Sequence, residues 1–218
     1  MRWYYLEVND YIVELLESID ESINSPANLS LPDPSAVTFY QNLKERKIWI
    51  NLGVDETMLE FAKYIALWNK EDEGKQKEER KPIWVYIFCY GGSMDFMWMF
   101  ADVIAASETP VYTVNMGQCA SAAAIIFMTG HKRFMLPSAS VLIHEGSGTI
   151  AGDAVKVFDQ AENYRAAVKR MHNYILAHTN IPSGTLAKKR NNDWELDSET
   201  CLKYGVCDRI IESLSEIN

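Results

Sequence analysis

A serine stands where a strand is expected to pass into a helix of small residues. The segment NMGQCASAAA places Ser121 directly after an apolar strand, at the start of a helix predicted over 120–128. A hydroxyl at such a turn is exposed at the carboxyl edge of a sheet beside helix N–H groups, as an acyl-transfer nucleophile requires. The GxSxG pattern of α/β-hydrolases is absent. A small serine that lets two helices pack closely is the more ordinary explanation of the residue, so the local pattern alone does not establish catalysis.

A histidine and several carboxylates could complete such a site. His144 ends the apolar segment VLIH (141–144), where it could act as a base or serve as a cap or core residue. A serine and a base need an orienting carboxylate. The residues alone do not choose among four candidates, which are Asp153, Asp193, Asp197 and Asp208.

Two glycines follow another buried strand. In IFCYGGS, Gly91 and Gly92 stand between the strand and a helix that begins near Ser93. Glycines there allow backbone N–H groups to face a ligand oxygen, although a tight turn is the simpler explanation. Neither a GxGxxG nor a Walker A pattern is present, so the segment does not indicate nucleotide binding.

Composition excludes several classes of protein. The 218 residues include 30 acidic and 21 basic side chains, for a net charge of −9, and 48% are hydrophobic. A disordered chain and a nucleic-acid or anionic-membrane partner are therefore not expected. The longest apolar run, 120–128, is too short to cross a bilayer, and we expect no targeting segment. The four cysteines have no metal-ligand spacing, which favours buried thiols in a cytoplasmic protein and no metal.

Strand and helix patterns alternate along the chain and predict an α/β fold with right-handed crossovers. Strands are expected at 47–51, 83–88, 111–114, 134–136, 141–144 and 206–211. Helices are expected from Asp55 to about Trp68, from Ser93 to before Pro110, over 120–128, from Asp153 along the apolar stripe to Ile175, and shortly before Gly205. The run 70–81, with five acidic and five basic residues, is expected to be a solvated loop.

The N-terminal segment differs from the rest. Residues 9–24 have a helical apolar period with an acidic opposite face, and the Pro-rich stretch 24–37 is expected to be a linker or loop. We therefore divide the chain into an appendage, 1–36, and a main domain, 37–218. The appendage contains seven acidic residues and one basic residue, so it carries −6 of the total of −9.

From about Leu43 to Ile211 the sequence resembles the Clp peptidase family, the proteolytic subunit of ATP-dependent proteases. Five ordered segments carry the resemblance: NLKERKIWINLGVDE, IWVYIFCYGGS, TVNMGQCASAAA, KRFMLPSASVLIHEGSG and NDWELDSETCLKYGVCDRII. It implies a ClpP/crotonase-like α/β fold with repeated ββα units and a long handle helix. It also implies that Ser121 is the nucleophile, His144 the general base and Asp193 its orienting acid. The N–H groups of Gly92 and Ala122 would form the oxyanion hole, and no metal or organic cofactor would be needed.

The resemblance also implies an assembly and partners. Family members stack two heptameric rings around a chamber in which unfolded proteins are cleaved, and the ring contact corresponds to Gly146 to about Asn180. An ATP-driven AAA+ unfoldase of the ClpX or ClpA type would dock on an apolar pocket between subunits. The corresponding positions are apolar here, although core packing explains them equally well: Trp84, Tyr86, Val114, Met116, Phe134 and Leu136.

Some features depart from the family pattern. The gating hairpin at the N-terminus is not recognisable, and Glu145-Gly146-Ser147 lacks the usual proline. These departures fit a specialised or phage-encoded relative, and phage relatives cleave capsid scaffold without an ATPase. Two other functions remain as alternatives, a catalytically silent ring subunit and an acyl-CoA enzyme of the crotonase-like fold.

Overall fold

The computed structural model describes residues 33–146, 148–189 and 192–217. The chain divides into two compact units, Met1–Ile48 and Trp49–Asn218. The helix expected over 9–24 and most of the expected connector lie outside the described residues. No helix in the described part of the chain is long and apolar enough to span a membrane.

The described part of the first unit contains the helix α2 (Pro34–Lys44). The carboxylate of Asp33 caps it by accepting a hydrogen bond from Ser35 N–H at 2.8 Å, and Pro34 occupies the first turn. The expectation of a linker is therefore wrong for residues 34–37. A proline after an aspartate starts a helix here, because the first helical N–H has no acceptor in any case and the proline backbone angle is already helical.

The described residues form a sheet of seven strands in which the order β1-β2-β3-β4-β7 is joined by a branch from β3 through β5 to β6. The strands are β1 (Lys47–Ile50), β2 (Ile83–Cys89), β3 (Val111–Ala120), β4 (Lys132–Met135), β5 (Ser140–Ile143), β6 (Trp194–Asp197) and β7 (Arg209–Ile210). Only the β5–β6 pair is antiparallel among the registers determined for described residues. The expected α/β class is confirmed, and each expected strand is present.

The strand β3 is longer than the sequence indicates because it pairs with β2 along one edge and with two strands in turn along the other. Its first half pairs with β4, and its second half, from Gln118, pairs with β5. The buried Asn115 lies at the change of partner, where its amide donates to Ser140 O at 2.8 Å and accepts from Gly117 N–H at 3.0 Å. Asn115 thus supplies hydrogen bonds to backbone groups at the point where β3 changes its pairing from β4 to β5.

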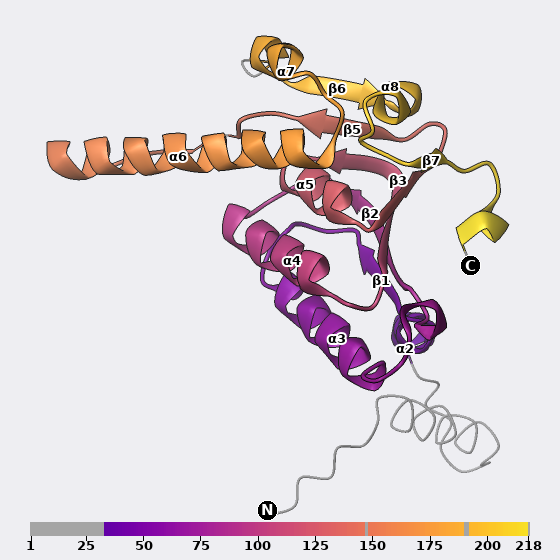
Figure 1. Ribbon diagram of the computed structural model, residues 1–218. Helices are drawn as coiled ribbons and strands as arrows, with labels where there is room; N and C mark the ends of the chain where they lie inside the picture. The colour runs from indigo at the N-terminus through magenta and orange to yellow at the C-terminus, as the bar shows by residue number, and fades with distance from the viewer. Residues whose placement is uncertain (1–32, 147, 190–191, 218) are drawn as a thin grey trace, which may run out of the picture. The chain divides into compact units, whose positions relative to one another are not determined.

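The α-helices that follow in the second unit are α3 (Thr57–Glu71), α4 (Met94–Ala106), α5 (Ala122–Thr129), α6 (Ala154–His178), α7 (Ser183–Lys189) and α8 (Ser198–Lys203). Figure 1 shows α3, α4 and α5 side by side on one face of the sheet. All eight residues of α5 are buried. The four cysteines are free and buried, as expected. The sequence did not predict α7, β6 or the short 3₁₀ helices η1 (Lys77–Glu79) and η2 (Leu214–Ile217).

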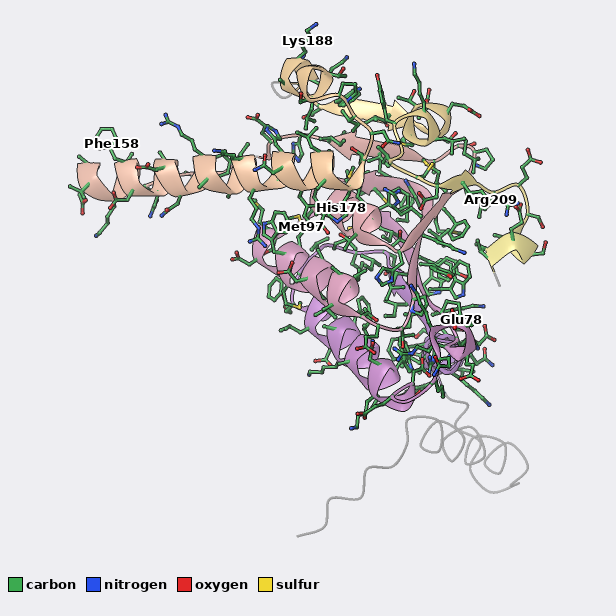
Figure 2. The ribbon with its side chains drawn as sticks, in the orientation of Figure 1. Glu78, Met97, Phe158, His178, Lys188 and Arg209 are labelled. Carbon is green, nitrogen blue, oxygen red and sulfur yellow. The ribbon has the colours of Figure 1, made fainter. Side chains whose placement is uncertain are left out.

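The long helix α6 begins where the sequence predicts, after Asp153, whose carboxylate accepts a hydrogen bond from Lys156 N–H at 3.1 Å. Of its apolar stripe, only Met171 and Ile175 near the C-terminal end are buried. Phe158 is 74% exposed and points away from the helix into solvent (Figure 2). The N-terminal half of α6 therefore carries apolar side chains that stay exposed within the described part of the chain.

Candidate active site

Ser121 occupies a strained turn between β3 and α5. Its φ of 57° and ψ of −122° lie in a region that residues with a side chain rarely adopt. Its backbone is held on both sides, because its N–H donates to Leu142 O at 2.9 Å and its carbonyl accepts from Ala124 N–H at 3.0 Å. The side chain makes no helix-capping hydrogen bond, so the turn presents a hydroxyl that is not used for capping.

Strand register brings His144 to the same edge of the sheet as Ser121. In the parallel pair of β3 and β5, Ala120 lies opposite Leu142, so Ser121 and His144 both follow the carboxyl ends of neighbouring strands. The His144 side chain is 28% exposed. Its Nε2 atom is buried and has no hydrogen-bond partner among the described residues. A buried nitrogen without a partner is costly and therefore calls for an explanation, such as a role in chemistry.

The antiparallel pair of β5 and β6 places one aspartate beside this histidine. Ile143 lies opposite Trp194, so the next positions outward are His144 and Asp193. His144 Nδ1 is 3.6 Å from the Asp193 carboxylate, within the range of an ion pair but longer than a hydrogen bond.

The other three candidate carboxylates are used elsewhere. Asp153 caps α6, Asp197 caps α8, and Asp208 accepts hydrogen bonds from the backbone and side chain of Arg133. Hydrogen bonds from Thr200, first from its side chain and then from its backbone, lower the pKa of Asp197, as expected for a cap. The local pattern left four aspartates as candidate partners of His144. Of these four, strand pairing places Asp193 beside the histidine.

The glycine turn lies directly against Ser121. Gly91 and Gly92 have φ values of 108° and 154°, which favour glycine. A Cβ atom on Gly91 would lie 2.7 Å from the Ser121 Cβ and 3.2 Å from the Ala122 nitrogen. The close approach therefore requires glycine, and the turn, Ser121 and the start of α5 form one site.

Val54 holds this turn in place, a role that sequence reasoning missed. Its N–H donates to Gly91 O at 2.9 Å and its carbonyl accepts from Ser93 N–H at 2.7 Å. A Cβ atom on Gly92 would lie 2.3 Å from Val54 O, so the two segments are in close backbone contact. The segment NLGVDE carried part of the family resemblance, and that was the available signal.

The N–H of Ala122 is available at this site. Ala122 is the first residue of α5, where an α-helix offers its N–H groups no internal acceptor. The positive end of the helix dipole lies at the same place. A negative charge that develops next to Ser121 would therefore be stabilised.

Neighbouring thiols do not compete as nucleophiles. Burial raises the pKa of the Cys89 thiol, and burial raises the pKa of Cys119 well above its ordinary value. Both remain protonated at neutral pH, and a thiol is a poor nucleophile compared with a thiolate. Among the described residues, no group of three or more side chains is arranged to hold a metal ion.

Comparison with known proteins identifies the family. The model of the Clp protease family matches residues 33–214. The chain belongs to the Clp protease family. Its relatives include proteins named ATP-dependent Clp protease proteolytic subunit 2 from three spirochaetes. The Treponema pallidum (strain Nichols) protein is 30% identical over 139 residues, 63% of this chain and 70% of the relative. The Treponema denticola protein is 31% identical over 63% of this chain and 70% of the relative. The Borreliella burgdorferi protein is 32% identical over 62% of this chain and 69% of the relative.

Membership of the Clp protease family confirms the resemblance and the fold class that it implies. It also supports a serine peptidase function. Within the family fold, the segment after His144 is tied to the long helix: Tyr164 Oη donates to Glu145 O at 2.9 Å, and His172 Nε2 is 3.5 Å from the Glu145 carboxylate.

The remaining histidines have contacts of their own. His131 Nδ1 accepts the Val111 N–H at 2.8 Å, and the His178 ring stacks on Tyr174 at 3.9 Å between centroids. His172, as above, lies beside Glu145. The sequence ranked these three below His144, and none is placed at the Ser121 turn by the contacts found.

The positions for which the family resemblance implied a docking pocket form a buried cluster in this chain. Trp84, Tyr86, Val114 and Phe134 are buried together with Ile211 and Ile217, and Tyr112, Met116 and Leu136 pack against them. Tyr86 Oη donates to Ile217 O at 3.1 Å, so η2 covers part of the cluster. These apolar residues could line a docking pocket or pack in the core. In the single chain they pack in the core.

Proposed function

We propose that the chain is a serine endopeptidase in which Ser121, His144 and Asp193 act as a catalytic triad. One observation carries the proposal, the pairing of β3, β5 and β6. It brings the three residues to one sheet edge, with His144 Nδ1 facing Asp193 and His144 Nε2 without a hydrogen-bond partner among the described residues. Family membership supports the same chemistry.

In this mechanism Ser121 Oγ attacks the carbonyl carbon of a peptide bond while His144 Nε2 takes the serine proton. The histidine then returns that proton to the leaving amine, and water resolves the acyl-enzyme through the same base. Asp193 holds the imidazole in the tautomer that leaves Nε2 free to accept. The 3.6 Å separation of His144 from Asp193 must shorten when substrate binds, as is common for catalytic contacts that are loose in the free enzyme.

The N–H groups of Gly92 and Ala122 stabilise the oxyanion. Attack by Ser121 places negative charge on the substrate oxygen, and two fixed donors beside it are worth about 3–4 kcal/mol each in comparable enzymes. The contact of the glycine turn with Ser121 and the start of α5 supports this assignment. No step requires a metal or organic cofactor.

The chain acts as part of an assembly of two stacked heptameric rings. The exposed apolar residues Val155 and Phe158 on the N-terminal half of α6 support this, because a monomer gains nothing by exposing them next to each other. An enclosed chamber would admit only unfolded proteins, so that a triad with broad specificity does not cleave folded proteins. We place this activity in the cytoplasm. Delivery by an AAA+ unfoldase belongs to the same proposal, although the covered aromatic cluster means that docking there requires η2 to move.

The proposal is tested with a fluorophosphonate probe, which labels activated serines. We expect wild-type protein to be labelled and to hydrolyse short fluorogenic peptides. Ser121→Ala should abolish both while the assembly stays intact. Ser138→Ala is the matched control because Ser138 is exposed on the turn before β5. Equal peptidase activity in wild type and Ser121→Ala would contradict the assignment.

Two further outcomes separate the alternative functions. A wild-type protein that assembles but takes no label would be a silent ring subunit. A labelled protein that cleaves a folded scaffold protein without any ATPase would be a prohead-type protease, whereas cleavage that requires an unfoldase and ATP would be the Clp-type reaction. Casein, which has no stable fold, serves as the substrate that both active types should degrade.

A further inference from the structure

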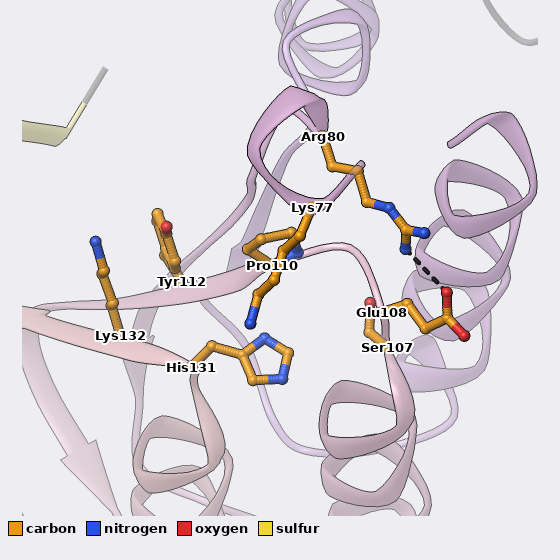
Figure 3. A pocket seen from close by; sticks show the side chains of 8 residues that line it. All are labelled: Lys77, Arg80, Ser107, Glu108, Pro110, Tyr112, His131 and Lys132. Carbon is orange, nitrogen blue, oxygen red and sulfur yellow. Dashed lines mark hydrogen bonds and ion pairs between the residues drawn. The ribbon is translucent and has the colours of Figure 1, made fainter. Parts of the chain in front are cut away.

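The two ends of the sheet use their polar groups differently. At the amino ends of β3 and β4, side chains that include Lys77, His131 and Lys132 line a cavity of about 450 Å³ (Figure 3). His131 Nδ1 accepts the Val111 N–H there at 2.8 Å, which is a contact within the fold at the opposite end of β3 from Ser121. At the carboxyl end of β2, by contrast, a buried thiol joins two segments that lie beside Ser121.

Part of the wall of this cavity comes from the charged run 70–81. Most of its side chains are exposed, as expected, but the expectation of a loop throughout is wrong. Asp72 is fully buried, accepts a hydrogen bond from Thr109 Oγ1 at 2.9 Å and pairs with Lys75 Nζ at 2.8 Å. A capping box between Gln76 and Glu79 then forms η1.

The thiol at the carboxyl end belongs to Cys89, which is the last residue of β2 and is 1% exposed. It donates to Leu52 O at 2.8 Å and accepts the Gly91 N–H at 3.4 Å. A second carbonyl, Gly91 O, lies farther from the sulfur, at 3.7 Å. One side chain thus links the start of the glycine turn to the segment that leads to Val54.

The Cys89 thiol is protonated at neutral pH and can therefore donate. Burial raises the pKa of Cys89 more than the hydrogen bond from the Gly91 N–H lowers it, and the negative charge of Asp55 raises it further. A thiolate could accept from Gly91 but could not donate to Leu52 O. The link to both segments therefore requires the neutral side chain.

The N–H groups of the glycine turn differ in their use. Gly91 N–H donates to the Cys89 sulfur, and Ser93 N–H donates to Val54 O at 2.7 Å. Gly92 N–H, between them, makes no hydrogen bond to the residues that the structure describes. The turn therefore leaves free the N–H group to which the proposed mechanism assigns the oxyanion.

The position of Gly92 depends on contacts from outside the turn. Two successive glycines have no side chains that could fix their own backbone. The Val54 segment lies against Gly92 on one side, and Ser121 lies against Gly91 on the other. The Cys89 thiol is the side chain found to hydrogen-bond to both the turn and the segment before Val54 among the described residues.

We propose that the Cys89 thiol positions the oxyanion hole, an inference that rests on the proposed serine peptidase function. Its hydrogen bonds to Gly91 N–H and Leu52 O hold the glycine turn so that Gly92 N–H keeps a fixed direction. Stabilisation of an oxyanion depends on donors that are in place before the reaction. Cys89 does not contact the reacting atoms, so it is a positioning residue and not a catalytic one.

Peptide kinetics on the full-length protein test this role. Cys89→Ala removes both hydrogen bonds and should lower kcat and kcat/KM equally, by roughly tenfold, because the lost stabilisation exists only in the transition state. A peptide boronate, whose adduct with a serine imitates that state, should bind more weakly by the same factor. Cys89→Ser supplies a hydroxyl that can donate to Leu52 O and accept from Gly91, so it should restore most of the activity.

Cys207→Ala is the matched control. Cys207 is equally buried, at 1% exposed, and precedes β7, which pairs with β4 and not with the strands that carry the proposed triad. This variant should lose stability as Cys89→Ala does but keep kcat. Unchanged kcat in Cys89→Ala, equal losses in Cys89→Ala and Cys207→Ala, or no rescue by Cys89→Ser would overturn the inference.

Amide hydrogen exchange tests the same link without any reaction. In a Ser121→Ala background, Cys89→Ala should speed exchange in the peptide that spans residues 89–93, whereas Cys207→Ala should not. Equal exchange in all three proteins would show that the thiol does not hold the turn. Wild-type protein that takes no fluorophosphonate label would contradict the proposed function, and the exchange result would still decide whether Cys89 holds the turn.

Discussion

At the scale of single residues, the proposed site depends on one aspartate among several. Asp193 directly precedes the short strand β6 and Asp197 is the last residue of that strand, and both are exposed. Antiparallel pairing puts Asp193 beside His144, whereas it places Asp197 opposite Ser140 at the other end of β5. Substitution of the two residues can therefore distinguish a catalytic role of the Asp193 carboxylate from a general effect on β6.

We predict that Asp193→Asn lowers kcat/KM for a fluorogenic peptide by about 10²- to 10⁴-fold, because the amide stabilises the wrong histidine tautomer. Asp197→Asn should leave activity unchanged, since asparagine is as good a helix cap as aspartate. Steady-state kinetics on both variants, with thermal unfolding as a check on folding, measure the difference. Similar activity losses in both would show that β6, rather than the Asp193 carboxylate, matters.

At the scale of elements, three connections build the site. The strand-to-helix turn at Ser121, the glycine turn after β2 and the segment at Val54 meet through backbone contacts. Because backbone atoms of these segments are in direct contact, no flexible side chain between them could move aside to accommodate a substitution. Small alterations in one turn should therefore move Ser121.

We predict that Gly91→Ala removes activity. The added Cβ would lie 2.7 Å from the Ser121 Cβ, and a φ of 108° costs a residue with a side chain roughly 1–3 kcal/mol. A displacement of the nucleophile by about 1 Å is enough to lower kcat/KM about 100-fold. Fluorophosphonate labelling and peptide kinetics measure the loss.

Gly184→Ala is the control for that prediction. Gly184 lies in α7, and a Cβ there would meet no atom within 4 Å. Alanine should leave activity unchanged and raise the free energy of unfolding by roughly 0.5–1 kcal/mol, because it restricts the unfolded chain. A fully active Gly91→Ala enzyme would show that the turn tolerates the methyl group and does not constrain Ser121.

At the scale of the whole molecule, the exposed apolar face of α6 indicates that the chain functions in an assembly. Phe158 is 74% exposed, while the C-terminal end of the same helix is buried through Met171 and Ile175. The contacts of Glu145 with Tyr164 and His172 connect α6 to the segment that follows His144. Assembly through α6 would therefore also steady the proposed base.

We predict that Phe158→Ser shifts the protein toward smaller species in sedimentation velocity and lowers peptidase activity per chain. The reason is that the variant would lose apolar area from the contact that we propose between rings. Asp159→Ser, at the adjacent exposed position, should assemble and cleave like wild type. If both variants sediment like wild type, the N-terminal half of α6 does not form the contact.

Much of the fold could be predicted from local pattern. The continuous apolar run of β2, the buried helix α5 and the cap of α6 at Asp153 were all recognisable, because burial and capping select residue types over a few neighbouring positions. The helix α2 and the strand β6 were missed. In α2 a proline that starts a helix was taken for part of a linker, and β6 is short with mixed polarity.

The amino-acid sequence by itself determined the family, the α/β class and the residues that could do chemistry, since these depend on motifs and local periodicity. The family resemblance implied Asp193, but only the tertiary structure showed that this carboxylate faces His144 and why Gly91 must be glycine. It also showed that Lys77 from the charged run shares a cavity with His131 and Lys132. These facts depend on strand register and on backbone contacts between residues far apart in the chain, which no local pattern records.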